Sequence, residues 1–134
     1  MAKIGFTLFS ARYPDNEAFS LPTRDDESIA IAKQFLDLAK TNDILMVANG
    51  GIFAHGGGRT QMNTKGNEAL DDHPALGIWY GADEPGRNRI RQLQPGYAEA
   101  KQRITRPVLS VTNRYDHLQT LGETADILGN DPYP

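Results

Sequence analysis

The sequence has no cysteine among its 134 residues, which excludes disulfide bonds, thiolate nucleophiles and cysteine-bound metals. It also lacks any run of about 18 apolar residues of the kind that predicts a membrane-spanning helix. Its first residues, Met1 to Gly5, contain neither an apolar run nor a cleavage signal, so we expect no secretory leader. These absences favour a soluble, cytoplasmic protein that has no membrane partner.

A strong excess of charge is missing as well. The formal net charge is −3, which predicts no general attraction to nucleic acid or to a membrane surface. Hydrophobic residues make up 39% of the chain and occur throughout it, so disorder is not expected. A chain of this length fits one domain with one core, and we expect residues 1–134 to form a single domain.

The spacing of apolar residues predicts alternating strands and helices. Strand patterns cover residues 3–12, 43–47, 75–81 and 108–112, and helical patterns cover 24–40, 97–105 and about 116–128. Residues 61–75 are predicted to form a loop with at most a brief helical turn, and 87–94, which end at Pro95-Gly96, either a short strand or two helical turns. This order predicts an α/β fold, with mixed α+β as the alternative. We expect a central sheet of about four to five strands with about three helices packed on it.

Two of these segments allow finer predictions. The helix over 24–40 is preceded by Thr23, which forms a Ser/Thr-x-x-Asp capping pattern with Asp26. A broad apolar face is predicted for this helix, made of Ile31, Phe35 and Leu38 together with Ile29, Ala32, Leu36 and Ala39. The strand over 75–81 carries Trp79, the only tryptophan, which we expect in the core.

A glycine-rich segment, residues 49–60, follows the predicted buried strand over 43–47. Its candidate ligand-binding residues are Asn49, Gly50, Gly51, Gly56, Gly57, Gly58, Arg59 and Thr60. Glycines after a strand can present backbone N–H groups to an anion, and an arginine adds positive charge with fixed geometry. The spacing matches neither the dinucleotide fingerprint nor the phosphate loop. The alternative is a wide glycine turn at which two backbones cross closely.

His55 lies inside this segment and is the candidate catalytic residue, because histidine titrates near neutral pH and can act as a general acid or base. The alternative is a solvent-exposed histidine without a catalytic role. His73 follows two aspartates and His117 follows Asp116, but neither pair has the spacing of a helical zinc site. Turn chemistry and helix capping explain them better, and we expect neither a metal nor a cofactor. Four carboxylates could act as acid and base, but no spacing singles out a pair among them: Asp15, Glu17, Asp83 and Glu84.

A basic band lies between Pro85 and Arg114. It contains Arg87, Arg89, Arg91, Lys101, Arg103, Arg106 and Arg114, against Glu99 alone. If residues 87–93 form a strand, Arg87, Arg89 and Arg91 project from one face as a row suited to phosphates. In a helix only Arg87 and Arg91 are neighbours. The alternative is a solvated face that pairs with the acids at 68–84 of the same chain or of a neighbouring copy.

Three hypotheses for function follow. The first is binding, with or without turnover, of a small anionic ligand such as a nucleotide or phosphorylated metabolite at the glycine segment, supported by the arginines at 87–91. A site shared between subunits would suit so small a chain, so we expect a homo-oligomer. The second is a non-enzymatic assembly or interaction protein, for example a viral one, ordered through contacts between copies. The third, nucleic-acid binding through the basic band, has no aromatic–basic motif to support it.

Overall fold

The computed structural model describes residues 8–10, 25–48 and 64–131. Its strands are β1 (Leu8–Ser10), β2 (Leu45–Ala48), β3 (Leu76–Asp83), β4 (Val108–Thr112) and β5 (Ile127–Asn130). Its helices are α1 (Asp26–Thr41), α2 (Thr64–Asp71), α3 (Arg87–Ala100) and the short α4 (Leu118–Leu121). Two 3-10 turns, η2 (Tyr115–His117) and η3 (Gly122–Thr124), flank α4. In the described part of the chain, no helix is long and apolar enough to cross a membrane.

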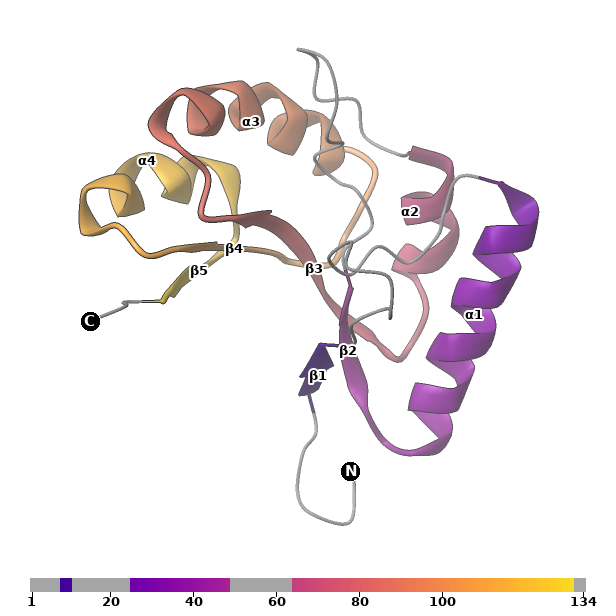
Figure 1. The fold of residues 1–134 in the computed structure, drawn as a ribbon. Coiled ribbons are helices and arrows are strands. Elements are labelled where there is room, and N and C mark those ends of the chain that lie inside the picture. The colour runs from indigo at the N-terminus through magenta and orange to yellow at the C-terminus, as the bar shows by residue number, and fades with distance from the viewer. Residues whose placement is uncertain (1–7, 11–24, 49–63, 132–134) are drawn as a thin grey trace.

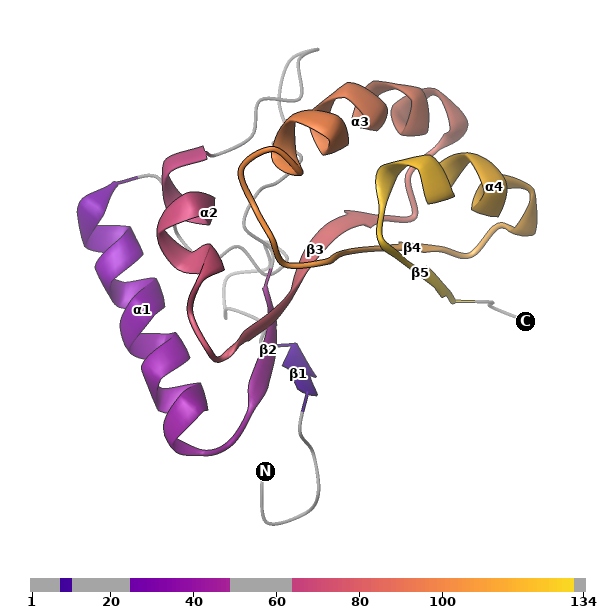
Figure 2. The ribbon, with the colours of Figure 1, turned by 180° about the vertical axis from the view of Figure 1, so that it is seen from behind.

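All five strands are parallel, and they lie in the sheet in their order along the chain. Parallel neighbours require crossover connections. Each of the four connections between the described strands contains a described helix, which is α1, α2, α3 and α4 in chain order. Right-handed crossovers that advance in one direction place their helices on one face, and Figures 1 and 2 show the four helices on the same side of the sheet. This winding is that of (β/α) barrels, whereas doubly wound sheets reverse direction. The predicted α/β fold is confirmed, with four helices instead of about three.

The core lies between this sheet and the helices. Trp79 is completely buried, as predicted, and its strand neighbours in register are Ala48 and Val108. Leucines of three helices, Leu36, Leu70 and Leu93, belong to the same cluster of buried residues. The burial of β4 alternates strictly, with Val108, Ser110 and Thr112 buried and Leu109 and Val111 half-buried. The half-buried residues therefore point to the face of the sheet that no described helix covers.

The first helix begins two residues later than its predicted capping pattern. Asp25, not Thr23, is the N-cap: its carboxylate accepts a 2.8 Å hydrogen bond from the Ser28 amide. The Ser28 hydroxyl in turn accepts a 3.1 Å hydrogen bond from the Asp25 amide, which completes a capping box.

The predicted apolar face of α1 is too wide to be buried as a whole. Its buried part consists of Ile29, Ala32, Leu36 and Ala39, whereas Ile31, Phe35 and Leu38 are 44%, 39% and 61% exposed. The core covers only one stripe of the helix, because α1 lies on the outer side of α2 (Figure 1).

Residues 64–71 form a helix where we predicted a loop. The apolar content of α2 is low, but its inward face is buried: Asn67, Leu70 and Asp71 are at most 3% exposed. Polar residues on that face removed the apolar periodicity on which the prediction depended.

The proline at position 95 does not end a structural element. Helix α3 continues through Pro95 and Gly96 to Ala100, so 87–94 is helical and the predicted separate helix over 97–105 is wrong. Buried residues Ile90, Leu93 and Ala100 keep one helical face on both sides of the proline. Packing along that face offsets the missing backbone hydrogen bond.

The predicted helix over about 116–128 is also wrong beyond residue 124. Helix α4 ends at Leu121, and Ile127 to Asn130 form β5, in register with Leu109 to Thr112 of β4. Ala125 has an extended backbone, with φ −156° and ψ 152°. A fifth strand on the sheet therefore replaces the last turns of that helix.

Candidate ligand-binding edge

Because all strands are parallel, their carboxyl ends meet at one edge of the sheet, which we call the carboxyl edge. Its described part consists of Ser10, Ala48, Asp83, Thr112 and Asn130, the last residues of the five strands, together with the described residues that follow β3, β4 and β5. The opposite edge, where the strands begin, is called the amino edge. Ligands of parallel α/β proteins bind outside the carboxyl ends of the strands.

Ala48, the last residue of β2, lies at this edge, and the glycine-rich segment follows it in the sequence. The predicted ligand-binding residues Asn49 to Thr60, and the predicted catalytic residue His55, lie outside the described residues. Arg87, Arg89 and Arg91 are the predicted site residues that the structure places.

These three arginines do not form a row. They belong to the first two turns of α3, so the strand interpretation of residues 87–93 is wrong. Arg87 is the first residue of the helix and stands at the carboxyl edge next to the end of β3. Arg91 follows one turn further along and is exposed, while Arg89 is half-buried on another side of the helix. One guanidinium, that of Arg87, is thus brought to the edge at which the glycine segment begins.

The amino end of α3 lies at the same edge. Its N-cap is Gly86, which supplies no side-chain hydrogen bond, and the first turn contains no acidic residue. A Cβ added at Gly86 would have no neighbour within 4 Å. Helix α1 differs, since Asp25 caps it and Asp26 and Glu27 occupy its first turn. The positive end of the α3 dipole is therefore not offset by acids of its own first turn, which favours a nearby anion.

Arg87 belongs to an ion-pair group that connects α3 with the end of β4. Its Nη2 atom lies 3.0 Å from Oδ2 of Asp116. Arg114 donates to both oxygens of the same carboxylate, with 3.1 Å from Nε to Oδ1 and 3.1 Å from Nη2 to Oδ2. The hydrogen bond from Arg114 is the main cause that lowers the pKa of Asp116 to about 2. Two cations share one carboxylate, so the group carries an excess positive charge.

His117 lies beside this group, and sequence reasoning missed it as a site residue. Its ring is buried, and its Nε2 atom is 4.0 Å from Oδ2 of Asp116. The other ring nitrogen, Nδ1, is buried and has no hydrogen-bond partner among the described residues. The Asp116-His117 pair was visible in the sequence, but its place near Arg87 depends on the pairing of distant segments.

Acidic residues occupy another part of the carboxyl edge. Burial is the main cause that raises the pKa of the Tyr80 hydroxyl group. The charge of Asp83 and a hydrogen bond between Tyr80 and Asp83 raise this pKa further, and so do the charges of Asp131 and Glu84. Glu84 has a positive φ of 42°, which is uncommon for a residue other than glycine. The edge is thus acidic around the end of β3 and basic around Arg87 and Arg114. Within the described ranges, no group of three His, Asp or Glu side chains is placed to hold a metal ion.

The remaining cations of the basic band near the amino edge are paired within the chain. Arg103 lies 2.9 Å from Glu68, and Lys101 lies 3.1 Å from Asp126. Arg106 donates to the backbone oxygens of Asp71 and His73, at 3.0 and 3.3 Å. Of these three cations, Arg103 pairs with an acid at 68–84 as the alternative predicts, whereas Lys101 pairs with Asp126 and Arg106 donates to backbone oxygens.

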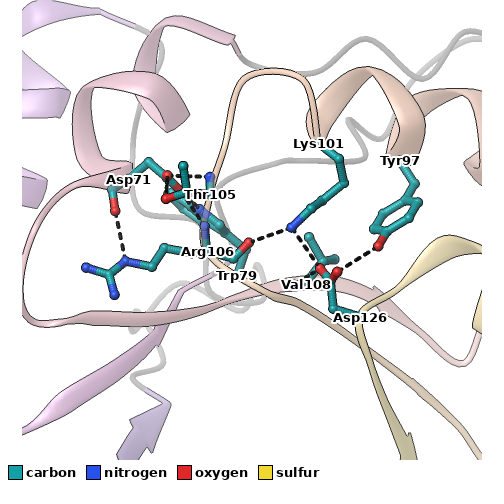
Figure 3. A network of polar contacts seen from close by, with 8 residues as sticks. All are labelled: Asp71, Trp79, Tyr97, Lys101, Thr105, Arg106, Val108 and Asp126. Carbon is teal, nitrogen blue, oxygen red and sulfur yellow. Dashed lines mark hydrogen bonds and ion pairs between the residues drawn. The ribbon is translucent and has the colours of Figure 1, made fainter.

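Figure 3 shows two carboxylates near the amino edge that accept several hydrogen bonds each, those of the buried Asp71 and of the partly exposed Asp126. Asp71 accepts hydrogen bonds from Trp79, from the amide and hydroxyl of Thr105 and from the amide of Arg106. Asp126 accepts hydrogen bonds from Tyr97, Lys101 and Val108. Burial raises the pKa of each carboxyl group, but these donors outweigh it and lower both pKa values. With their oxygens occupied in this way, both side chains connect elements of the fold.

Comparisons with protein-family models, with curated proteins and with solved structures found no match to this chain. The function therefore has to be inferred from the residues and their geometry.

Proposed function

We propose that this protein binds a small anionic ligand, such as a nucleotide or a phosphorylated metabolite, at the basic part of the carboxyl edge. The observation that carries the proposal is that two features suited to anion binding occur at the same edge of the sheet. The glycine segment leaves β2 at the edge where α3 presents an amino end without a side-chain cap, with Arg87 as its first residue. Backbone N–H groups, a helix dipole and guanidinium groups are the means by which proteins bind phosphate.

Each part has a separate role in this proposal. The glycines Gly50, Gly51, Gly56, Gly57 and Gly58 supply backbone donors, and Arg59 and Arg87 neutralise charge. Arg87 shares Asp116 with Arg114, so Arg87 can turn to a ligand while Arg114 keeps Asp116 paired. If the ligand is turned over, His55 of the glycine segment is the proposed acid or base.

A thermal-unfolding screen against nucleotides, cyclic nucleotides, sugar phosphates and divalent metals tests the proposal. A ligand present at about 100 times its dissociation constant adds about 2.7 kcal/mol of stability. Arg59→Ala and Arg87→Ala should each reduce this stabilisation. Arg103→Ala is the matched control, since it removes the same charge from the Glu68 pair near the amino edge. Equal loss of binding in all three variants, or no ligand that stabilises the wild-type protein, would contradict the proposal.

Assembly of copies of this chain is the second candidate, and one observation favours it. Ile31, Phe35 and Leu38 form an exposed apolar stripe along α1, with the spacing by which a helix docks into an apolar groove. Light scattering of the wild-type protein and of Phe35→Glu would test it: the assembly hypothesis requires an oligomer that Phe35→Glu dissociates. Nucleic acid is not proposed as a partner, because Lys101, Arg103 and Arg106 of the basic band that suggested it are engaged within the chain.

A further inference from the structure

The turn that follows β4 presents a tyrosine to solvent at the carboxyl edge. Tyr115 is 70% exposed, the largest fraction among the exposed large apolar side chains of the described residues. A single exposed aromatic residue is common on protein surfaces and needs no explanation. Tyr115 differs from the others in its surroundings, because a charged residue stands on each side of it, Arg114 and Asp116. An aromatic ring is thus placed within a group of exposed charges.

The backbone of this turn is held by hydrogen bonds on both sides of the tyrosine. The amide of His117 donates a 3.1 Å hydrogen bond to the carbonyl oxygen of Arg114, which closes a turn that has Tyr115 and Asp116 at its corner. The amide of Arg114 donates a 3.1 Å hydrogen bond to the hydroxyl of Thr112, the last residue of β4. The position of Tyr115 is therefore fixed before any ligand binds, which reduces the entropy lost on binding.

Two guanidinium groups belong to the same group of side chains. Arg114 directly precedes Tyr115, so their Cα atoms are about 3.8 Å apart. Arg87 reaches the turn from α3, and its Nη2 atom lies 3.0 Å from Oδ2 of Asp116. The side chains of Arg87 and Arg114 are 65% and 60% exposed. Because one carboxylate faces two cations, the excess positive charge beside the tyrosine attracts an anion from solvent.

A ring beside two guanidinium groups is complementary to a nucleotide. Its phosphate accepts hydrogen bonds from arginine, and its base stacks on an aromatic face. A sugar phosphate offers only the first of these contacts and leaves the ring in water. Stacking of one base on an aromatic side chain raises the affinity by about fivefold or more. The arrangement therefore distinguishes ligands that carry a base from those that do not.

We propose that the base of a nucleotide stacks on Tyr115 while its phosphate binds Arg87 and Arg114. This inference rests on the proposed function for the anion at Arg87, and all three of its residues belong to the described part of the chain. Tyr115 favours nucleotides over sugar phosphates and takes no part in a chemical step.

The test compares two probes that share a ribose and a phosphate, adenosine monophosphate and ribose 5-phosphate, by calorimetric titration. The wild-type protein should bind adenosine monophosphate at least about fivefold more tightly than ribose 5-phosphate. Tyr115→Ala should abolish this preference and leave the affinity for ribose 5-phosphate unchanged. Tyr115→Phe should keep the preference, because stacking needs the ring and not the hydroxyl.

Two further variants serve as controls. Arg114→Gln should weaken the binding of both probes by the same factor, because both carry the phosphate. Phe35→Ala removes an exposed ring from α1 and should leave both affinities unchanged. Since Tyr115 is exposed, the midpoint of thermal unfolding of Tyr115→Ala should differ little from that of the wild-type protein.

The opposite results separate the two proposals. If the wild-type protein binds both probes equally well, or if Tyr115→Ala keeps the preference, stacking on Tyr115 is refuted and anion binding stands. The same holds if Tyr115→Phe loses as much of the preference as Tyr115→Ala, because the hydroxyl and not the ring would then be responsible. If neither probe binds, both proposals fail.

Discussion

The carboxylate of Asp71 in α2 accepts a 2.7 Å hydrogen bond from the indole nitrogen of Trp79 in β3. Both residues are buried, at 3% and 0% exposure. The same carboxylate accepts hydrogen bonds of 2.6 and 2.7 Å from the amide and hydroxyl of Thr105, just before β4. One side chain therefore fixes the end of α2 to the centre of the sheet and to the next crossover connection.

Replacement of this carboxylate should destabilise the fold. Asp71→Asn keeps the shape of the side chain but removes the charge and turns one acceptor into a donor that faces other donors. We expect the free energy of unfolding in urea to fall by about 2–4 kcal/mol. Asp72→Asn is the control, because Asp72 is the exposed neighbour in the chain, and it should change the free energy by no more than about 0.5 kcal/mol. Similar losses in both variants would contradict the structural role of Asp71.

The free energy of unfolding should also fall at low pH because of the carboxyl groups of Asp71 and Asp126. Both carboxyl groups have pKa values below their ordinary value in the folded protein, whereas an unfolded aspartate has a pKa of about 3.9. A lowered pKa means that the stabilisation is complete above the unfolded pKa and is lost as pH falls through the folded pKa. Urea unfolding from pH 7 to pH 2 should show this loss below about pH 4, and Asp71→Asn should reduce it. An acid dependence identical to that of the wild-type protein would exclude Asp71 as a source.

Because only one side of α1 is buried, truncation of two of its leucines should have different effects on stability. Leu36 is completely buried and Leu38 is 61% exposed. Leu36→Ala should lower the free energy of unfolding by about 2–5 kcal/mol, because it leaves a cavity in the core. Leu38→Ala should cost less than about 1 kcal/mol. If the two variants lose equal stability in urea, the stripe that contains Leu38 is covered in solution, which would support assembly through α1.

A close contact on the uncovered face of the sheet can be tested with a double mutant. A Cβ added at Gly129 of β5 would lie 2.9 Å from Cγ2 of Val111 in β4. Gly129→Ala should therefore cost about 1–3 kcal/mol through overpacking. In the presence of Val111→Ala the same change should cost clearly less, so a double-mutant cycle should give a favourable coupling energy. Additive effects would show that the two strands are not in this register.

Strands with strong local signals were predictable from the sequence. Pro107 followed by alternating apolar residues gave β4 its exact bounds, Val108–Thr112. The apolar run with Trp79 identified β3, although this strand extends two residues beyond the predicted end at Gly81. Helix α1 was recognisable from its periodicity, but the choice between its two apolar stripes depends on what packs against it.

The errors occurred where tertiary contacts outweigh local pattern. Helix α2 buries the polar residues Asn67 and Asp71, and polar residues in a segment without apolar periodicity led us to predict a loop. The apolar face of α3 continues through Pro95, and β5 is a strand because it pairs with β4. The grouping of Arg87 with Asp116 joins residues 29 positions apart, a contact that composition and spacing do not reveal. A useful signal was present, since an arginine directly after the Pro85-Gly86 turn stands at the start of a helix.

The location of bound ligand is the most direct test of the proposed carboxyl-edge site. Backbone amide resonances of the isotope-labelled protein should be recorded by NMR during titration with the best ligand of the thermal screen. Binding should shift the amides of Glu84, Gly86 and Arg87, those of residues 113–117, and those at the start of α2. Amides at the amino edge, such as Ala75, Thr105 and Asp126, should change little. Shifts confined to the amino edge, or a saturated complex without shifts at the carboxyl edge, would contradict the account.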